Sequence, residues 1–171
     1  MSQFIILFCI CFSLHVLRTI YSIFKYKKQI NSKNKFIFLT MLIIMILLWV
    51  SFFQMSENDT VKLLIPEFVK YFGFILFILG LILFIVPLIQ LKGLENIDHL
   101  VTNGIFSIIR HPMYLGMIFW ILGYPLFMQA KYTLITSIIW IPNILYWRFL
   151  EEKELLNTFN EYKSYKKRTI F

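Results

Sequence analysis

Long apolar stretches separated by short polar segments dominate this chain. Five such stretches lie at about residues 3–24, 36–55, 67–91, 112–128 and 132–147. A helix needs about 20 apolar residues to cross a bilayer, so each stretch is a candidate span, with 112–128 near the lower limit. The last two flank the polar tip 129–131 and are expected to form a hairpin. The pattern therefore predicts an all-α, polytopic membrane helix bundle with about five transmembrane helices.

Composition supports the membrane class. Hydrophobic residues make up 59% of the chain and charged residues 15%, whereas soluble domains average roughly 45–50% and about 25%. These values exclude a disordered chain and a soluble globular domain. The net charge of +8 is expected to reflect cytoplasmic loops, so we predict no nucleic-acid partner. Cys9 and Cys11 point to different sides of a helix and predict neither a disulfide nor a metal site.

The basic residues predict an orientation. Thirteen of the 17 Lys and Arg residues fall in the segments 25–35, 92–111 and 148–171, and only Lys62, Lys70 and Lys131 fall on the opposite side. The positive-inside rule then places the N-terminus outside and the C-terminus in the cytoplasm. Arg18 lies in the first span, where its long side chain can reach the cytoplasmic interface. The segment after residue 148 is expected to form an amphipathic cytoplasmic helix.

The start of the fourth span is a candidate anion-binding site. Pro112 suits the first position of a helix, because its missing N–H loses no partner there. His111 then lies at the cap, with Arg110 before it and Tyr114 on the first turn. A helix N-terminus attracts anions such as carboxylates and phosphates. The alternative is that Arg110 only reaches the interface, His111 only caps the helix and Tyr114 belongs to the interfacial aromatic belt.

Two adjacent carboxylates, Glu151 and Glu152, directly follow the last span. Carboxylates at a membrane boundary are costly unless they are paired or functional. On a continuing helix, Glu151 shares a face with Leu155, Thr158 and Tyr162, where it could bind an ammonium group or a ribose hydroxyl. The alternative is a solvated helix start that pairs with nearby basic side chains.

Several short motifs occur in order around the predicted hairpin. Leu-Val-Thr-Asn-Gly-Ile-Phe spans 100–106, Arg-His-Pro-Met-Tyr-Leu-Gly spans 110–116, Glu-Glu spans 151–152 and Phe-Asn-Glu-Tyr spans 159–162. Together they resemble the isoprenylcysteine carboxyl methyltransferase family, whose wider group includes the phospholipid N-methyltransferases. The resemblance covers about 67–168. We therefore expect a two-helix membrane anchor over 1–66 and a methyltransferase-like core over 67–171.

The resemblance implies an integral membrane methyltransferase that uses S-adenosylmethionine. Its acceptor would be a lipid or lipid-modified molecule, isoprenylcysteine-like or phospholipid-like, that enters from the bilayer; the acceptor's identity and the oligomeric state stay open. By position, the expected cofactor contacts are Asp98, His99, Leu100, Val101, Phe106, His111, Pro112, Met113, Tyr114 and Glu151. The expected catalytic residues are Arg110, Arg148 (toward the substrate) and Glu152 (a base for an amine acceptor, a role that His99 could also take).

Two departures from the family pattern are relevant. Phe106 replaces the usual tyrosine and therefore lacks one hydroxyl, and Asn160 stands where glycine is common. Two other functions stay open from the residues alone. One is an NADPH-dependent membrane reductase of the sterol type, which resembles this fold. The other is a non-catalytic membrane scaffold.

Overall fold

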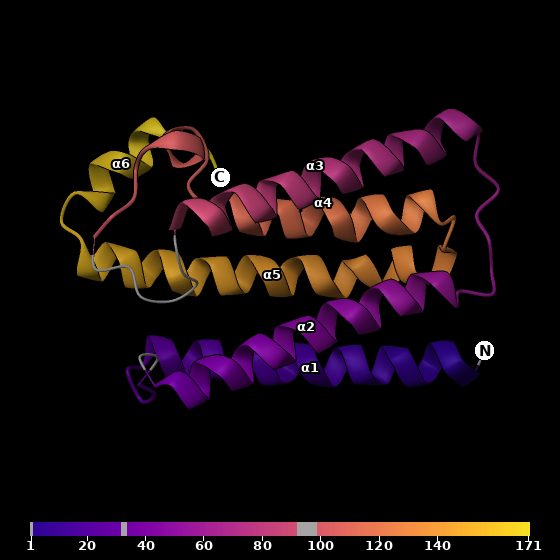
Figure 1. Cartoon of the computed structure of the whole chain (residues 1–171), viewed down its shortest axis with the longest axis horizontal. Coiled ribbons are helices and arrows are strands. Elements are labelled where there is room, and N and C mark those ends of the chain that lie inside the picture. Colours follow the sequence, from indigo (N-terminus) through magenta and orange to yellow (C-terminus); the bar gives the residue numbers. More distant parts are fainter. Residues whose placement is uncertain (1, 32–33, 92–98) are drawn as a thin grey trace.

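The computed structural model describes residues 2–31, 34–91 and 99–171, and these residues form helices without any β-strand. The helices are α1 (Ser2–Tyr26), α2 (Lys35–Glu57), α3 (Glu67–Leu91), the 3₁₀-helix η1 (Gly104–Ser107), α4 (Pro112–Phe127), α5 (Lys131–Thr158) and α6 (Tyr162–Arg168). Figure 1 shows α1 to α5 running roughly alongside one another, with η1 and α6 gathered at the end of the bundle far from the N-terminus. The predicted all-α polytopic bundle is confirmed.

Within the described part of the chain, four helices are long and apolar enough to cross a membrane, namely α1, α2, α3 and α5. The fifth predicted span, α4, has 16 residues and reaches about 24 Å at 1.5 Å per residue, which is short of a full hydrocarbon core. Helix α3 has the predicted bounds, whereas α5 continues past Trp147 to Thr158. Backbone hydrogen bonding does not stop at the edge of an apolar stretch, so the following charged residues extend the same helix.

Glycines allow α3 and α4 to lie in close contact along their length. A Cβ atom at Gly80 would lie 2.8 Å from the carbonyl oxygen of Gly116, and one at Gly123 would lie 2.7 Å from that of Gly73. These distances leave no room for any side chain. The two glycine pairs therefore set the spacing of α3 and α4, in agreement with the general use of small residues where membrane helices meet.

The connection between α2 and α3 holds the start of α5. The buried Asp59 carboxylate accepts hydrogen bonds from the backbone N–H of Thr133, at 2.8 Å, and from its hydroxyl, at 3.2 Å. Asp59 therefore satisfies one of the free backbone N–H groups in the first turn of α5, although the two residues are far apart in the chain. In the sequence, Asp59 is one polar residue in a short loop, and nothing there indicates this contact.

A buried polar cluster joins α1 to α5. His15 stacks on Trp140 with ring centroids 4.4 Å apart, and its Nδ1 lies 3.1 Å from Oδ1 of Asn143. The Asn143 amide and the Trp147 indole both donate to the hydroxyl of Thr19. From these contacts we interpret His15 as a residue that packs α1 against α5.

The C-terminal segment folds back onto the residues that precede α4. Ile109 and Ile170 form a parallel bridge, in which the Arg110 N–H donates to the Ile170 carbonyl and the Ile170 N–H to that of Ile108. The prediction that one continuous helix carries Glu151 and Tyr162 is wrong, because Phe159 adopts an extended conformation and ends α5. Tyr162 begins α6 instead.

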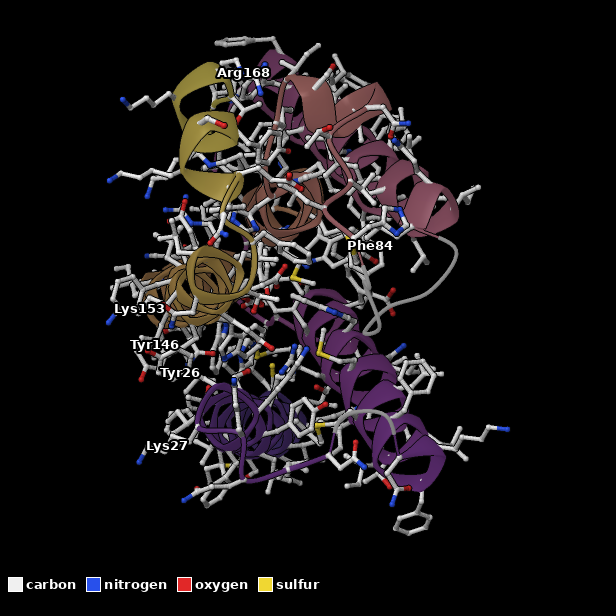
Figure 2. All side chains as sticks on the ribbon, turned by 90° about the vertical axis from the view of Figure 1, so that its left-hand side faces the viewer. Tyr26, Lys27, Phe84, Tyr146, Lys153 and Arg168 are labelled. Carbon is white, nitrogen blue, oxygen red and sulfur yellow. The ribbon has the colours of Figure 1, made fainter. Side chains whose placement is uncertain are left out.

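Figure 2 looks onto this end of the bundle. Lys27, which follows α1, Lys153 on α5 and Arg168 on α6 are all exposed there. Basic side chains from three separate segments thus lie at the end that holds η1 and α6.

Candidate active site

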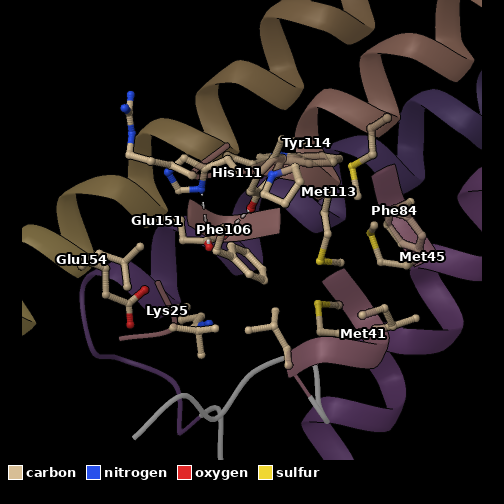
Figure 3. A pocket seen from close by; sticks show the side chains of 18 of the residues that line it. Lys25, Met41, Met45, Phe84, Phe106, His111, Met113, Tyr114, Glu151 and Glu154 are labelled. Carbon is tan, nitrogen blue, oxygen red and sulfur yellow. Dashed lines mark hydrogen bonds and ion pairs between the residues drawn. The ribbon is translucent and has the colours of Figure 1, made fainter. Parts of the chain in front are cut away.

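A cavity of about 370 Å³ lies at this end of the bundle, with walls from α1 to α6 and from the segment before α4. This volume falls in the usual range for small-molecule and cofactor sites. Figure 3 shows its two chemical halves. His111, Glu151, Glu154 and Lys25 lie on one side, and Met41, Met45, Phe84 and Met113 lie on the other. The cavity therefore offers charge at one side and an apolar surface at the other.

The polar half centres on the first turn of α4. The Tyr114 hydroxyl donates to Oε2 of Glu151 at 2.7 Å, and Nδ1 of His111 lies 3.9 Å from Oε1 of the same carboxylate. The other ring nitrogen of His111 lies 3.2 Å from the Tyr162 hydroxyl. Pro112 takes the first helical position, as predicted, but the His111 side chain makes no capping hydrogen bond. Its imidazole instead lies between Glu151 and Tyr162 in the cavity wall.

Burial determines the charge of this cluster. His111 is 4% exposed, and this burial lowers its pKa, although the Glu151 and Glu152 carboxylates act in the opposite direction. The imidazole is thus neutral at neutral pH and can donate from one nitrogen and accept at the other. Burial and the nearby Glu152 carboxylate raise the pKa of Tyr162, so its hydroxyl keeps its proton.

The lowered pKa of His111 predicts that the protein loses stability as the pH falls. The unfolded chain takes up a proton at His111 near the ordinary pKa of about 6.5, whereas the folded chain takes it up only at lower pH. The free energy of unfolding should therefore decrease as the pH falls from 7 to 5. In His111→Gln, the free energy of unfolding should change less over this pH range. Thermal denaturation in detergent at several pH values measures it, with His99→Gln, an exposed histidine, as the matched control. Equal slopes in the wild type and His111→Gln would contradict the prediction.

The C-terminal segment forms part of the cavity wall and is held by charge. The Glu152 carboxylate lies 3.1 Å from Nζ of Lys166 and 3.5 Å from Nε of Arg110. The Arg110 guanidinium also donates to the backbone carbonyls of Lys166 and Thr169. In addition, Tyr165 donates to the Phe106 carbonyl at 2.6 Å. These contacts bring Tyr162 and Tyr165 of α6 to the cavity.

The structure brings most of the predicted site residues together. The cavity is lined by Leu100, Val101, Phe106, Arg110, His111, Pro112, Met113, Tyr114 and Glu151. Three predicted residues do not line the cavity. His99 is exposed, and the Glu152 carboxylate faces Arg110 and Lys166. The Arg148 guanidinium lies 4.6 Å from the ring centroid of Phe171. Asp98 lies outside the described residues.

Sequence reasoning missed the wall that α1 and α2 provide. Arg18 and Lys25 of α1, and Met41, Met45 and Trp49 of α2, all line the cavity. The three α2 residues are spaced four apart and share one helix face, but α2 is apolar all round, so the sequence does not indicate which face meets the cavity. The division into an anchor and a core stays a prediction, although both parts contribute to this site.

Comparison with known proteins agrees with this geometry. The family model described as phospholipid methyltransferase matches residues 69–162, which is more than half of the chain. The chain belongs to the phospholipid methyltransferase family. This family consists of integral membrane methyltransferases related to the isoprenylcysteine carboxyl methyltransferases, so the predicted resemblance is confirmed. No curated protein and no solved structure matches the chain.

The segment shared with the phospholipid methyltransferase family begins near the start of α3 and ends at Tyr162, the first residue of α6. It includes the His111, Tyr114, Glu151 and Tyr162 cluster. It leaves out α1 and α2, which supply the opposite wall of the cavity. The matched segment therefore covers most of the polar half of the site. The apolar half combines Phe84 and Met113 of the matched segment with Met41 and Met45 of α2, which lies outside it.

Proposed function

We propose that this chain is an S-adenosylmethionine-dependent methyltransferase whose acceptor is a lipid or lipid-modified molecule. The observation that supports it best is the two-sided cavity. Its polar side, at His111, Tyr114 and Glu151, joins an apolar side rich in methionine. A polar cofactor and a lipophilic acceptor need these two surfaces next to each other. Together with the family assignment, this favours a methyltransferase over a membrane scaffold.

The donor set of the polar half fits S-adenosylmethionine. This cofactor carries a carboxylate, an ammonium group and a sulfonium whose methyl group is activated for transfer. In our proposal the Glu151 carboxylate, oriented by Tyr114 at 2.7 Å, faces the positive groups. The first turn of α4, with neutral His111, offers N–H donors to the carboxylate. The chain's contribution to the reaction is then positioning and the exclusion of water.

The apolar half suits an acceptor that arrives from the bilayer. Ile46 lines the cavity and is also 53% exposed on α2, so this wall reaches the outer surface of the bundle. Methionines are flexible and adapt to irregular apolar ligands. A carboxylate or thiolate acceptor would need no base. For an amine acceptor the bases expected from sequence were Glu152 and His99, and neither lines the cavity.

In our proposal the site lies at the cytoplasmic end, because the basic residues that predict orientation gather there. Arg110 and Glu152 then act as positioning residues that hold the C-terminal segment over the cavity. Glu152 pairs with Lys166 at 3.1 Å, and Arg110 donates to the backbone carbonyls of Lys166 and Thr169. The reductase alternative would require recognition of a nicotinamide cofactor. The match to a methyltransferase family over most of the cavity wall favours a methyltransferase over a reductase.

Calorimetric titration of the purified protein in detergent with S-adenosylmethionine and, separately, with NADPH tests the proposal. We expect binding of S-adenosylmethionine only. His111→Ala removes one buried hydrogen-bonding group, worth about 1–3 kcal/mol, and should weaken this binding by about 5- to 150-fold. The matched control is His99→Ala, an exposed histidine outside the cavity wall. Binding of NADPH alone would overturn the proposal in favour of a reductase. Binding of neither would leave a membrane scaffold.

A further inference from the structure

Arg18 is an unusual residue in the apolar first helix. It lies eight residues before the end of α1, which is about 12 Å along the helix axis. Its side chain is half-buried and lines the cavity. A charged side chain within a transmembrane segment is costly and usually faces the interior, where it pairs with another group or marks a binding pathway.

The contacts of Arg18 orient its guanidinium without neutralising it. The guanidinium donates to the Ser22 hydroxyl at 2.6 Å and lies 5.3 Å and 5.4 Å from the ring centroids of Tyr21 and Trp147. Across residues 2–31, 34–91 and 99–171, no carboxylate lies within 4.0 Å of it. Glu151, the nearby carboxylate of the α5 wall, is hydrogen-bonded to Tyr114 instead. A guanidinium has five donors, and among the described residues its one hydrogen-bond acceptor is the Ser22 hydroxyl.

Arg18 lies near enough to the proposed cofactor cluster for its charge to act on the Tyr114 hydroxyl, but it forms no hydrogen bond or ion pair with the described residues of that cluster. Trp147, whose ring it covers, precedes Glu151 by one turn of α5 and therefore lies farther from the C-terminal end of that helix. Arg18 also belongs to the α1–α2 pair, whose Met41 and Met45 form part of the apolar wall. Lys25, two turns after Arg18, lines the same cavity. Lys25 lies on the polar side, with Glu151 and Glu154, whereas Arg18 lies one helical turn deeper along α5, beside Trp147.

We propose that Arg18 binds an oxyanion, a phosphate or a carboxylate, in the head group of the lipid acceptor. The inference rests on the proposed function, because it assigns the apolar wall to the acceptor. Arginine suits both oxyanions, since its planar fork binds two oxygens at once. The aromatic rings of Tyr21 and Trp147 hold the guanidinium in place, which reduces the entropy lost on binding. Arg18 would then select acceptors by head-group charge, whereas the methionines accept their apolar chains.

Matched lipid pairs test this assignment in a neutral maltoside detergent. The phosphate pair is 1-oleoyl-glycerol-3-phosphate against 1-oleoylglycerol, and the carboxylate pair is oleate against oleyl alcohol. Tryptophan fluorescence follows binding, because Trp147 lies beside Arg18. We expect the wild type to bind one of the anionic lipids at least about tenfold more tightly than its neutral partner, which corresponds to about 1.4 kcal/mol.

Three variants separate a specific site from general charge attraction. Arg18→Gln should abolish the preference, and Arg18→Lys should keep part of it. Arg168→Gln, the same change at an exposed position of α6 outside the cavity wall, should keep all of it. S-adenosylmethionine affinity, measured in parallel, should be unchanged in all three, which also shows that the variants are folded.

Several outcomes would overturn the inference. One is a wild type without preference for either anionic lipid. Another is a preference that survives Arg18→Gln. A third is an Arg18→Gln variant that loses S-adenosylmethionine affinity but keeps its lipid preference, because the cation would then serve the cofactor carboxylate. If the wild type fails to bind S-adenosylmethionine yet shows the Arg18-dependent preference, the proposed function fails while the oxyanion site stands.

Discussion

Glu151→Gln is expected to weaken the binding of S-adenosylmethionine by about 10- to 100-fold. Hydrogen bonds and contacts to a charged partner contribute about 1.5–3 kcal/mol each, and every 1.4 kcal/mol is a factor of ten. Glutamine keeps the size of the side chain and can still accept the Tyr114 hydrogen bond. The loss of cofactor affinity therefore measures the contribution of the negative charge of Glu151. Calorimetric titration in detergent measures it.

The control for this variant is Glu161→Gln, which removes an exposed carboxylate at the same end of the molecule that does not line the cavity. Its affinity for the cofactor should equal that of the wild type. Thermal denaturation of both variants shows whether each keeps its fold. A folded Glu151→Gln protein with unchanged affinity would exclude Glu151 from the cofactor site.

Gly80→Val is expected to lower the free energy of unfolding by about 3 kcal/mol, the upper end for overpacking. A Cβ atom at this position would meet the Gly116 carbonyl oxygen at 2.8 Å and the Trp120 backbone nitrogen at 2.9 Å. Both obstacles are backbone atoms, so α3 and α4 would have to move apart. Because Phe84 and Leu88 of α3 line the cavity, cofactor binding should weaken as well.

Denaturation in mixed detergent micelles, followed by circular dichroism, measures this loss. Val86→Ile adds a methylene group at a position of α3 that is 43% exposed and should leave stability unchanged. Gly116→Val, on the facing helix, should repeat the loss, since its Cβ atom would lie 2.6 Å from the Gly80 carbonyl oxygen. Wild-type stability in both glycine variants would mean that the two helices pack at a greater distance.

The contacts of Glu152 favour a structural role over the catalytic role expected from the sequence. Glu151 and Glu152 are adjacent, and the sequence suggests chemistry for both. Successive residues of a helix point about 100° apart, so only one of them faces the cavity. Glu151 faces it, whereas Glu152 binds Arg110 and Lys166 and holds the C-terminal segment. Glu152 thus affects the site indirectly, because it holds the C-terminal segment that forms part of the cavity wall.

The sequence alone determines the class of this protein and much of one half of its site. Apolar length predicts the helices, because a bilayer demands about 20 apolar residues and internal hydrogen bonding from each span. Local chemistry predicts the start of α4 at Pro112, because proline suits that position for reasons within its own backbone. The ordered motifs between residues 100 and 162 identify the family, and His111, Tyr114 and Glu151 do meet in one cavity.

Only the tertiary structure decides what depends on the rotation and approach of whole helices. Helices that are apolar all round, such as α2, have no polar face to indicate their orientation, so the role of Met41, Met45 and Trp49 as cavity wall is invisible in the sequence. The same holds for Asp59 at the start of α5 and for Arg18 beside Trp147, whose partners lie 74 and 129 residues away in the chain. Such contacts arise from packing between distant segments, and no local pattern of residues encodes them.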